Sequence, residues 1–320
     1  MSEISVSYDG RDPLSFFQEK VAAGEANGAR TMWIANHLFQ RDPMTLAAMA
    51  LSQTRRMGAA LMAMSPFTIH PVQIAMAAAT LDECFPGRIT LCIGVGAPAD
   101  LKSVGIEGQK PVRAMREALE TIRTLLAGGS VRFEGETFRV NDRRMAAGAH
   151  PVPIVLAASG PQMLELAGAA ADGVLISAGT SVEFVKWTLE HVARGAKGRA
   201  VRTHGVVYAS VDDEETRAHD RLRRTLAILL RGAHHAANLE RGGSVLDQAA
   251  LSAAVLADDW SRAEALITDD IVRRHTASGR PEQVRARLAS YHAAGLDEIV
   301  LAGARDGQQT ERIMQAGRSS

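Results

Sequence analysis

Short apolar runs recur along the chain, and most are followed by a stretch in which apolar residues return every three to four positions. The runs predict buried parallel strands at 4–8, 31–35, 59–64, 89–94, 154–157, 174–177, 205–211 and 298–302. The helical spacing predicts helices at 14–27, 43–54, 71–84, 112–127, 181–196 and 281–294. Eight strands that alternate with helices favour a (β/α)8 TIM barrel. A doubly wound open sheet would need a glycine-rich turn after the first strand, and the segment DGRDP at 9–13 is not one.

Two segments exceed the eight strand–helix units. Residues 131–140 alternate apolar and polar side chains around a central glycine, which predicts a hairpin addition. Residues 213–278 form a long, mostly helical insertion between the seventh and eighth strands. Insertions at the carboxyl ends of barrel strands build the walls of the site, so this one is expected to shape its mouth. No low-complexity linker divides the chain, and we expect residues 1–320 to form a single domain.

Composition narrows the class of function. The chain has 36 basic and 36 acidic residues, which leaves no basic footprint for nucleic acid. No apolar run reaches the roughly 18 residues of a membrane span, and residues 1–9 lack the features of a secretory signal. Cys84 and Cys92 lie in apolar surroundings and are interpreted as buried free thiols in a reducing compartment. We therefore expect a cytoplasmic protein. No histidine pair has the spacing of a metal site, so we expect no bound metal.

The segment 153–177 contains a strand, a small-residue turn, a helix and a second strand. Ser159 stands at the expected N-cap, and Pro161 falls in the first helical turn, where its missing N–H costs nothing. Ser159 and Gly160 leave the backbone N–H groups uncovered, so the helix that opens at Gln162 can receive a phosphate. The alternative is a tight turn without a ligand.

Two other strand ends carry candidate chemistry. His37 follows the second strand, where side chains of a barrel point toward the catalytic face, and its pKa range suits proton transfer. Gly94 and Gly96 end the fourth strand, where the backbone either approaches a flat ligand or simply shapes the loop. A loop histidine without a chemical role is the alternative for His37.

Together these segments resemble the bacterial-luciferase-like family of flavin- and deazaflavin-dependent oxidoreductases, and most closely its methylenetetrahydromethanopterin reductase branch. Its specific features are Gly-Arg before the fourth strand and the run SGPQML at 159–164, followed by ADG at 171–173. The resemblance extends over residues 33–43, 67–96, 110–138, 153–177 and 294–303.

The resemblance implies a barrel that binds FMN or coenzyme F420 at its carboxyl face and acts on a small organic substrate. The cofactor ring would pack on a bulge that ends the third strand, often with a non-prolyl cis peptide bond, and the phosphate would meet the turn at 158–162. The implied cofactor-binding residues are Met62, Ala63, Met64, Gly94, Gly96, Ala158, Ser159, Gly160, Gln162 and Ser177.

Three departures from the reductase branch concern the substrate. The branch carries carboxylates where this chain has Ser7, Asn36 and Ala97. A polar, amine-rich pterin would lose its hydrogen-bond acceptors there, which argues against a pterin reductase. We expect these three residues to contact a more apolar substrate, with His37 as the remaining ionisable group.

The sequence is compatible with three functions. With FMN the reaction is monooxygenation, using flavin reduced by a separate reductase. With F420 it is hydride transfer to a carbonyl, an imine or a double bond. A non-catalytic barrel that retains ligand binding is the third reading.

The resemblance also implies a homodimer. The helix 43–54 is rich in Ala, Met and Leu, and we expect contact through Met44, Leu46, Met49 or Ala50. A core-facing stripe is the alternative for these four residues.

Overall fold

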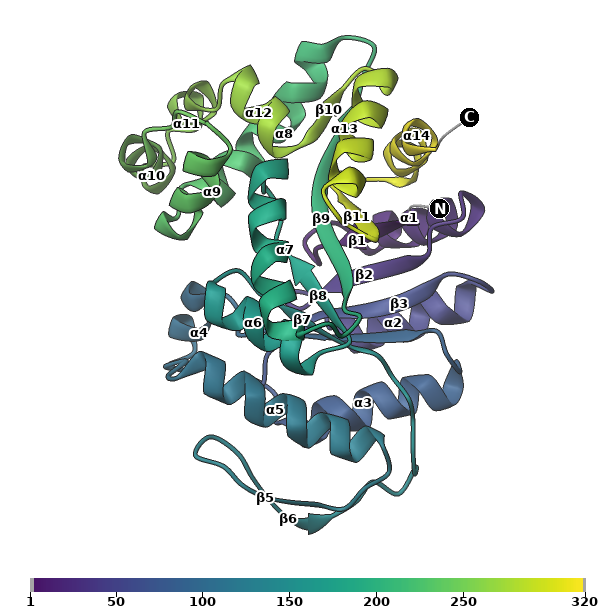
Figure 1. Ribbon diagram of the computed structural model, residues 1–320. Coiled ribbons are helices and arrows are strands. Elements are labelled where there is room, and N and C mark those ends of the chain that lie inside the picture. Colours follow the sequence, from purple (N-terminus) through teal and green to yellow (C-terminus); the bar gives the residue numbers. More distant parts are fainter. Residues whose placement is uncertain (1–2, 319–320) are drawn as a thin grey trace.

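The computed structural model describes residues 3–318 and contains a closed barrel of eight parallel strands (Figure 1). Strand β9 pairs with both β8 and β11, and this closes the sheet. The predicted TIM barrel is confirmed. Its strands are β1 (Glu3–Tyr8), β2 (Thr31–Ala35), β3 (Gly58–Met64), β4 (Ile89–Ile93), β7 (Ile154–Ala157), β8 (Gly173–Ile176), β9 (Arg202–Val211) and β11 (Glu298–Ala302).

Helices cover the outer face of the barrel, and proline starts several of them because the first turn does not need its N–H (Figure 1). The side chain of Asp42 caps α2, and the Nδ1 of His70 accepts the N–H of Val72 at the start of α3. The helices are α1 (Leu14–Ala26), α2 (Pro43–Gln53), α3 (Pro71–Cys84), α4 (Pro98–Ser103), α5 (Pro111–Leu126), α6 (Pro161–Ala170), α7 (Val182–Ala196), α13 (Pro281–Ala293) and α14 (Gly307–Gly317).

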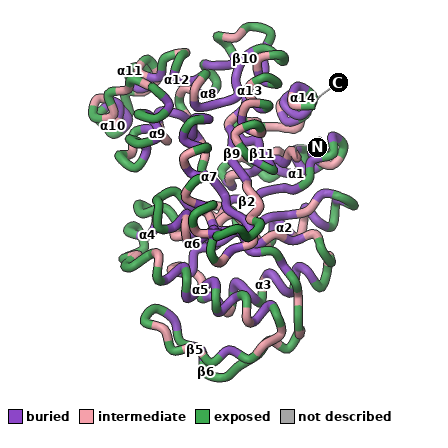
Figure 2. Tube along the Cα trace, in the orientation of Figure 1, coloured by how far each residue is buried: buried purple, intermediate pink, exposed green. Residues whose placement is uncertain are grey.

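The strands are the most continuously buried part of the chain, whereas the helices alternate buried and exposed positions (Figure 2). Inside the barrel Trp33, Cys92 and Val300 pack in one apolar cluster. The Nε1 of Trp33 donates a hydrogen bond of 2.9 Å to Glu298, near the amino ends of the strands. This packing fills the lower part of the barrel, so a ligand has room only toward the carboxyl ends of the strands.

The two additions are present. The hairpin consists of β5 (Val131–Glu134) and β6 (Arg139–Arg143), which pair antiparallel, and Glu117 of α5 accepts backbone N–H groups from its turn. The insertion has its own apolar cluster and also carries a short strand that pairs with β9 and that periodicity did not predict. Its elements are α8 (Glu215–Leu230), η1 (Ala233–His235), α9 (Ala236–Arg241), α10 (Gln248–Leu256), α11 (Trp260–Leu266), α12 (Asp269–His275) and β10 (Ala277–Gly279).

Two expectations about burial need correction. Cys92 is buried in the barrel interior, but Cys84 is exposed at the end of α3. On α2, Leu46 and Ala50 are only 3% and 1% exposed and pack into the core, so neither is free to contact a second molecule. Met44 and Met49 are partly exposed on the same helix.

Among residues 3–318 no helix is long and apolar enough to cross a membrane. Over the same residues no group of three or more His, Cys, Asp or Glu is arranged to hold a metal ion.

Candidate active site

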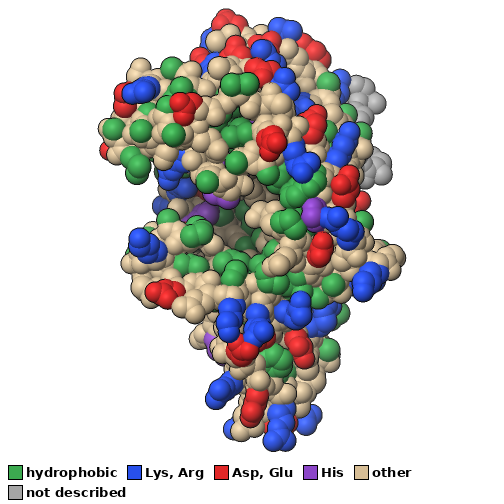
Figure 3. Space-filling view, turned by 60° about the vertical axis from the view of Figure 1, so that its left-hand side comes forward, with side chains coloured by type: hydrophobic (Ala, Val, Ile, Leu, Met, Phe, Trp, Pro, Cys, Tyr) green, Lys and Arg blue, Asp and Glu red, His purple; other side chains and the backbone are tan. Residues whose placement is uncertain are grey.

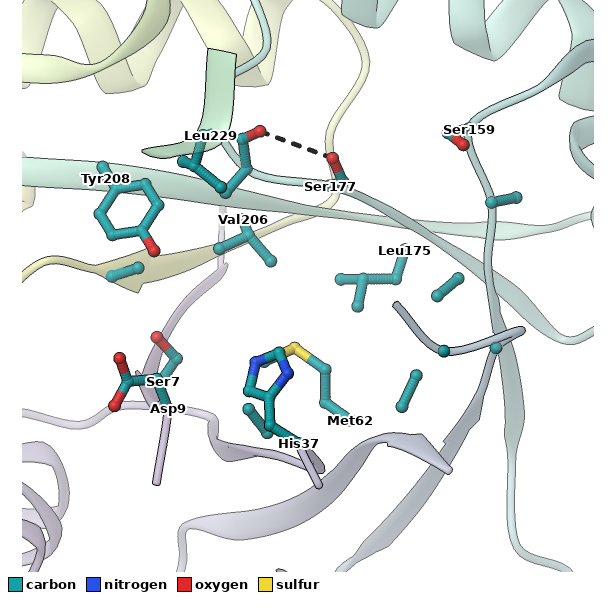
Figure 4. Close-up of a pocket in the computed structure, with 18 of the residues that line it drawn as sticks. Ser7, Asp9, His37, Met62, Ser159, Leu175, Ser177, Val206, Tyr208 and Leu229 are labelled. Atoms are coloured by element: carbon teal, nitrogen blue, oxygen red, sulfur yellow. Dashed lines mark hydrogen bonds between the residues drawn. The ribbon is translucent and has the colours of Figure 1, made fainter. Parts of the chain in front are cut away.

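A cavity of about 1060 Å³ opens at the carboxyl ends of the barrel strands (Figure 3). Side chains from β1, β2, β3, β8 and β9 line it, together with the loops that follow them (Figure 4). The insertion contributes Thr225, Ile228 and Leu229 of α8, so it does shape the mouth as expected. This volume is ample for a flat tricyclic ring and a small second molecule.

The cavity brings together residues that are far apart in the sequence. Most of the candidate residues named from the sequence line it: Ser7, His37, Met62, Ala63, Gly94, Gly96, Ala158, Ser159, Gly160, Gln162 and Ser177. At its edge the Ser177 hydroxyl donates a hydrogen bond of 3.5 Å to the carbonyl of Ala178 (Figure 4).

Three other candidates do not line the cavity. Met64 is fully buried in the core outside the barrel, because the irregularity of β3 between Leu61 and Met64 breaks the alternation that would place it inside with Ala60 and Met62. The backbone N–H of Asn36 donates a hydrogen bond to the carbonyl of Met62, and its side-chain amide donates one to the carbonyl of Ala63. Ala97 is exposed at the N-cap of α4. The expected substrate contacts of Asn36 and Ala97 therefore lack support in the geometry.

The end of β3 carries the irregularity that the resemblance implied. The peptide bond between Met62 and Ala63 is cis, and the register with β4 shifts between Leu61 and Met64. A Cβ atom at Gly94 would lie 3.0 Å from the Cβ of Ala63 and 3.2 Å from that of Ala157. Gly94 is therefore needed because β3, β4 and β7 approach each other closely here, whether or not a ligand is bound.

The small-residue turn after β7 is open. Gly160, and not Ser159, is the N-cap of α6, and no side chain caps this helix. Within residues 3–318 the N–H groups of Gln162 and Met163 have no acceptor, and the Ser159 hydroxyl has no partner. A Cβ atom at Gly160 would meet nothing within 4 Å. Free donors at a helix N-terminus, facing a cavity, fit the phosphate group of a flavin-type cofactor.

His37 lies on the cavity wall formed by the β2 end. Its Nδ1 is 3.9 Å from Oδ2 of Asp100, so the imidazole has an anion beside it. Burial lowers the pKa of His37 and Arg11 lowers it further, and these effects outweigh Asp100 and Asp9, which raise it. The imidazole is therefore mainly neutral at pH 7, because burial and Arg11 outweigh the two carboxylates.

Sequence reasoning missed several polar residues of the cavity. They are Asp9, Arg11, Asp12, Lys20, Tyr208 and Arg305. Asp9, Arg11 and Asp12 belong to the DGRDP loop, and its place at the carboxyl end of the first strand was the available signal. With these groups present, the expectation that His37 is the remaining ionisable group of the cavity is wrong. The expectation of a more apolar substrate stays a prediction.

Lys20 illustrates why some of these residues escape detection. It lies on α1 and is only 4% exposed, and its Nζ donates a hydrogen bond of 3.3 Å to the carbonyl of Ser7. Burial lowers the pKa of Lys20, while Asp12, Asp9 and Asp306 raise it. A helix residue that reaches past a strand into the cavity leaves no trace in apolar periodicity.

The sequence matches one protein family over most of its length. Residues 2–298 match the luciferase-like monooxygenase family. The chain is 31% identical to 5,10-methylenetetrahydromethanopterin reductase of Archaeoglobus fulgidus over 304 residues, covering 92% of this chain and 91% of the relative. It is 27% identical to F420-dependent glucose-6-phosphate dehydrogenase of Kineococcus radiotolerans over 310 residues, covering 91% and 87%.

A solved structure shares the fold over nearly the whole chain. The coenzyme F420 dependent tetrahydromethanopterin reductase of Methanopyrus kandleri superposes with a TM-score of 0.91, at 24% identity, covering 98% of both chains. The sequence-based recognition, including the reductase branch as the closest, is thus confirmed. The chain belongs to the luciferase-like monooxygenase family of oxidoreductases.

Proposed function

We propose that the protein is an F420-dependent oxidoreductase that transfers hydride between the deazaflavin ring and a small organic substrate. The observation that carries this proposal is one cavity with an open helix N-terminus on one side and His37 on the other. The named dependence of the reductase and dehydrogenase relatives on F420 supports this cofactor over FMN.

The apolar part of the cavity suits the ring. Met62 of β3, Leu175 of β8 and Val206 of β9 line it between the two polar ends (Figure 4), and Ala63 also lines the cavity. These side chains would hold a flat ring and exclude water from the hydride acceptor and donor. The cofactor supplies the hydride chemistry, and the protein supplies orientation and proton transfer.

The phosphate end also favours F420. Both cofactors carry a phosphate, but in F420 a phosphodiester leads on to a long acidic tail. Ser159 and Gly160 are exposed, and the space next to Gly160 is open, so a tail can continue past the turn into solvent. The N–H groups at the start of α6 would bind the phosphate itself.

Binding measurements test the cofactor. In calorimetric titrations of the apo protein, F420 should bind and FMN should bind at least about 10-fold more weakly, a gap of about 1.4 kcal/mol. Gly160→Asp should weaken F420 binding at least about 10-fold, because it adds negative charge at the helix N-terminus. Its backbone φ of −92° accepts any side chain, so the variant should fold.

Val245→Asp is the matched control, since Val245 is 92% exposed on the insertion and does not line the cavity. It adds the same charge and should leave the affinity for F420 unchanged. Tight binding of FMN without F420, with oxygen consumed once the flavin is reduced, would overturn the proposal in favour of monooxygenation. If Gly160→Asp binds F420 like the wild type, the phosphate lies elsewhere.

We also propose that residues 1–320 act as one cytoplasmic domain that assembles as a homodimer, and that a separate enzyme keeps the cofactor in the required redox state. The partly exposed Met44 and Met49 of α2 support the dimer, and Phe39, which precedes that helix, is 81% exposed. Exposed apolar side chains near one helix are candidates for a subunit contact.

A further inference from the structure

Tyr208 is a cavity residue to which the proposed function has so far given no role. It lies on β9, and its hydroxyl points into the part of the cavity bounded by Ser7 and Asp9 (Figure 4). Within residues 3–318 this hydroxyl makes no hydrogen bond to the protein. A phenol that faces a cavity without a partner is available to a ligand.

The same part of the cavity contains His37. His37, Tyr208 and Asp9 line this cavity (Figure 4), and Arg11 lines it too. Asp9 and Arg11 also influence the pKa of both His37 and Tyr208. Burial, followed by Asp9, raises the pKa of Tyr208. The phenol therefore keeps its proton at neutral pH and acts as a donor, while the neutral imidazole of His37 can accept.

Several other polar groups in this region already have partners in the protein. The Ser7 hydroxyl donates a hydrogen bond of 3.0 Å to the carbonyl of Leu301, and Lys20 donates to the carbonyl of Ser7. The Asp9 carboxylate accepts the N–H of Arg11 and pairs with its guanidinium at 3.7 Å. Of the hydroxyl groups of Ser7, Tyr8 and Tyr208 in this region, those of Ser7 and Tyr8 donate to backbone carbonyls, and within residues 3–318 only that of Tyr208 has no acceptor.

We propose that Tyr208 is a catalytic residue that donates a hydrogen bond to the reacting oxygen of the substrate, and that this substrate is an alcohol or the corresponding carbonyl compound. The inference rests on the proposed function. One oxygen atom can accept from the phenol of Tyr208 and, as an alcohol, donate its own hydrogen to His37. An imine nitrogen or a carbon–carbon double bond has no hydroxyl hydrogen to donate, so the imidazole of His37 would be left without a partner.

The step balances. In alcohol oxidation the carbinol C–H bond breaks and its electron pair moves with the hydrogen, as hydride, to oxidised F420. The O–H proton goes to His37, and the C–O bond gains its second pair and becomes a carbonyl. Tyr208 keeps its proton and stabilises the negative charge that develops on oxygen. Reduction of the carbonyl reverses each transfer.

Tyr208→Phe removes the hydroxyl and keeps the ring. With a panel of short secondary alcohols and the matching ketones, kcat should fall about 100-fold, the usual cost of losing one donor to a developing oxyanion. The dissociation constant of F420, measured by calorimetry, should stay unchanged, and so should the melting temperature. The pH dependence due to His37 should remain.

Tyr291→Phe is the matched control. The Tyr291 hydroxyl donates to the carbonyl of Thr180 in the buried core, away from the cavity, so its loss should lower the melting temperature and leave kcat unchanged. Normal kcat in Tyr208→Phe with F420 bound would overturn the role of Tyr208. Turnover of imines or alkenes alone would overturn the substrate class. A wild-type protein that does not bind F420 would instead refute the proposed function.

Discussion

His37 is held between charges of opposite sign, and this decides how it would act. Arg11 lowers the pKa of the imidazole, whereas Asp100 and Asp9 raise it, and burial gives the largest effect. Because the pKa lies below the ordinary value of 6.5, the ring is a base over the neutral range. Alcohol oxidation requires that neutral form, so activity should fall as pH drops through the lowered pKa.

Charge removal around His37 should move this acid limb in opposite directions. Asp100→Asn removes a nearby anion, which lowers the pKa of His37 and shifts the limb to lower pH. Arg11→Gln removes a cation and should shift it to higher pH. His37→Ala should abolish the limb and lower kcat about 100-fold, with F420 still bound. The measurement is kcat/KM against pH for all four proteins; shifts of the same sign in both charge variants would contradict the assignment.

At the level of single residues, sequence analysis predicts strand-end positions well. Residues such as His37 and Gly160 follow identifiable apolar runs, and in a parallel barrel all such strand ends meet at one face. It predicts side-chain direction poorly. Asn36 follows the same run as His37 but turns to the β3 bulge, and Tyr208 lies within a strand whose inward face could not be identified from periodicity alone.

The elements of the barrel are joined at their amino ends by one buried carboxylate. Glu298 of β11 accepts hydrogen bonds from Ser5 of β1 at 2.5 Å and from Trp33 of β2 at 2.9 Å. The Nδ1 of His204 on β9 lies 3.1 Å from its other oxygen. Four neighbouring strands therefore share one polar contact below the cavity.

This contact explains an error in the predicted elements. Apolar runs placed the start of β9 at residue 205, but the strand begins at Arg202. Thr203 and His204 are polar, and they can belong to the strand because Asp297 and Glu298 on the neighbouring strand side form hydrogen bonds with them. Hydrophobic periodicity has no means of detecting a strand end that is held by buried hydrogen bonds.

Glu298→Gln should be strongly destabilising. Burial alone would raise the pKa of Glu298, but His204 together with Ser5 and Trp33 lowers it from 4.5 to about 2. A carboxylate with a lowered folded-state pKa contributes stability above pH 4.5, and this contribution is lost as pH falls from 4.5 toward 2. Breaking a buried ionic contact costs about 3 kcal/mol, and we expect that loss at pH 7.

Urea unfolding at pH 7 and pH 3 tests this. The difference between wild type and Glu298→Gln should be smaller at pH 3 than at pH 7. Glu282→Gln is the control, because Glu282 pairs with Arg280 on an exposed surface of α13 and should hardly affect stability at either pH. Equal stability of Glu298→Gln and wild type at pH 7 would show that the contact is not needed.

In the whole molecule, the cavity opens at the carboxyl ends of the barrel strands, and α8 of the insertion forms part of its wall. The order of strands and helices follows from the sequence because each βα unit is local. Contacts between two molecules cannot be predicted in this way, because an apolar helix face has the same sequence pattern whether it packs against its own core or against a second molecule. The sequence suggested four contact residues on α2, and the structure leaves only Met44 and Met49 available.

The proposed homodimer should therefore depend on the surface that Phe39, Met44 and Met49 provide. Phe39 has a positive φ of 64°, which asparagine tolerates well, so Phe39→Asn removes the exposed ring without straining the backbone. Multi-angle light scattering at micromolar concentrations should give twice the 34.2 kDa chain mass for wild type and a shift toward the monomer for Phe39→Asn. Val245→Asn, which removes an even more exposed apolar side chain from the insertion, should remain dimeric. A wild-type monomer would exclude the dimer, and a dimer that loses nothing in Phe39→Asn would place the contact on another face.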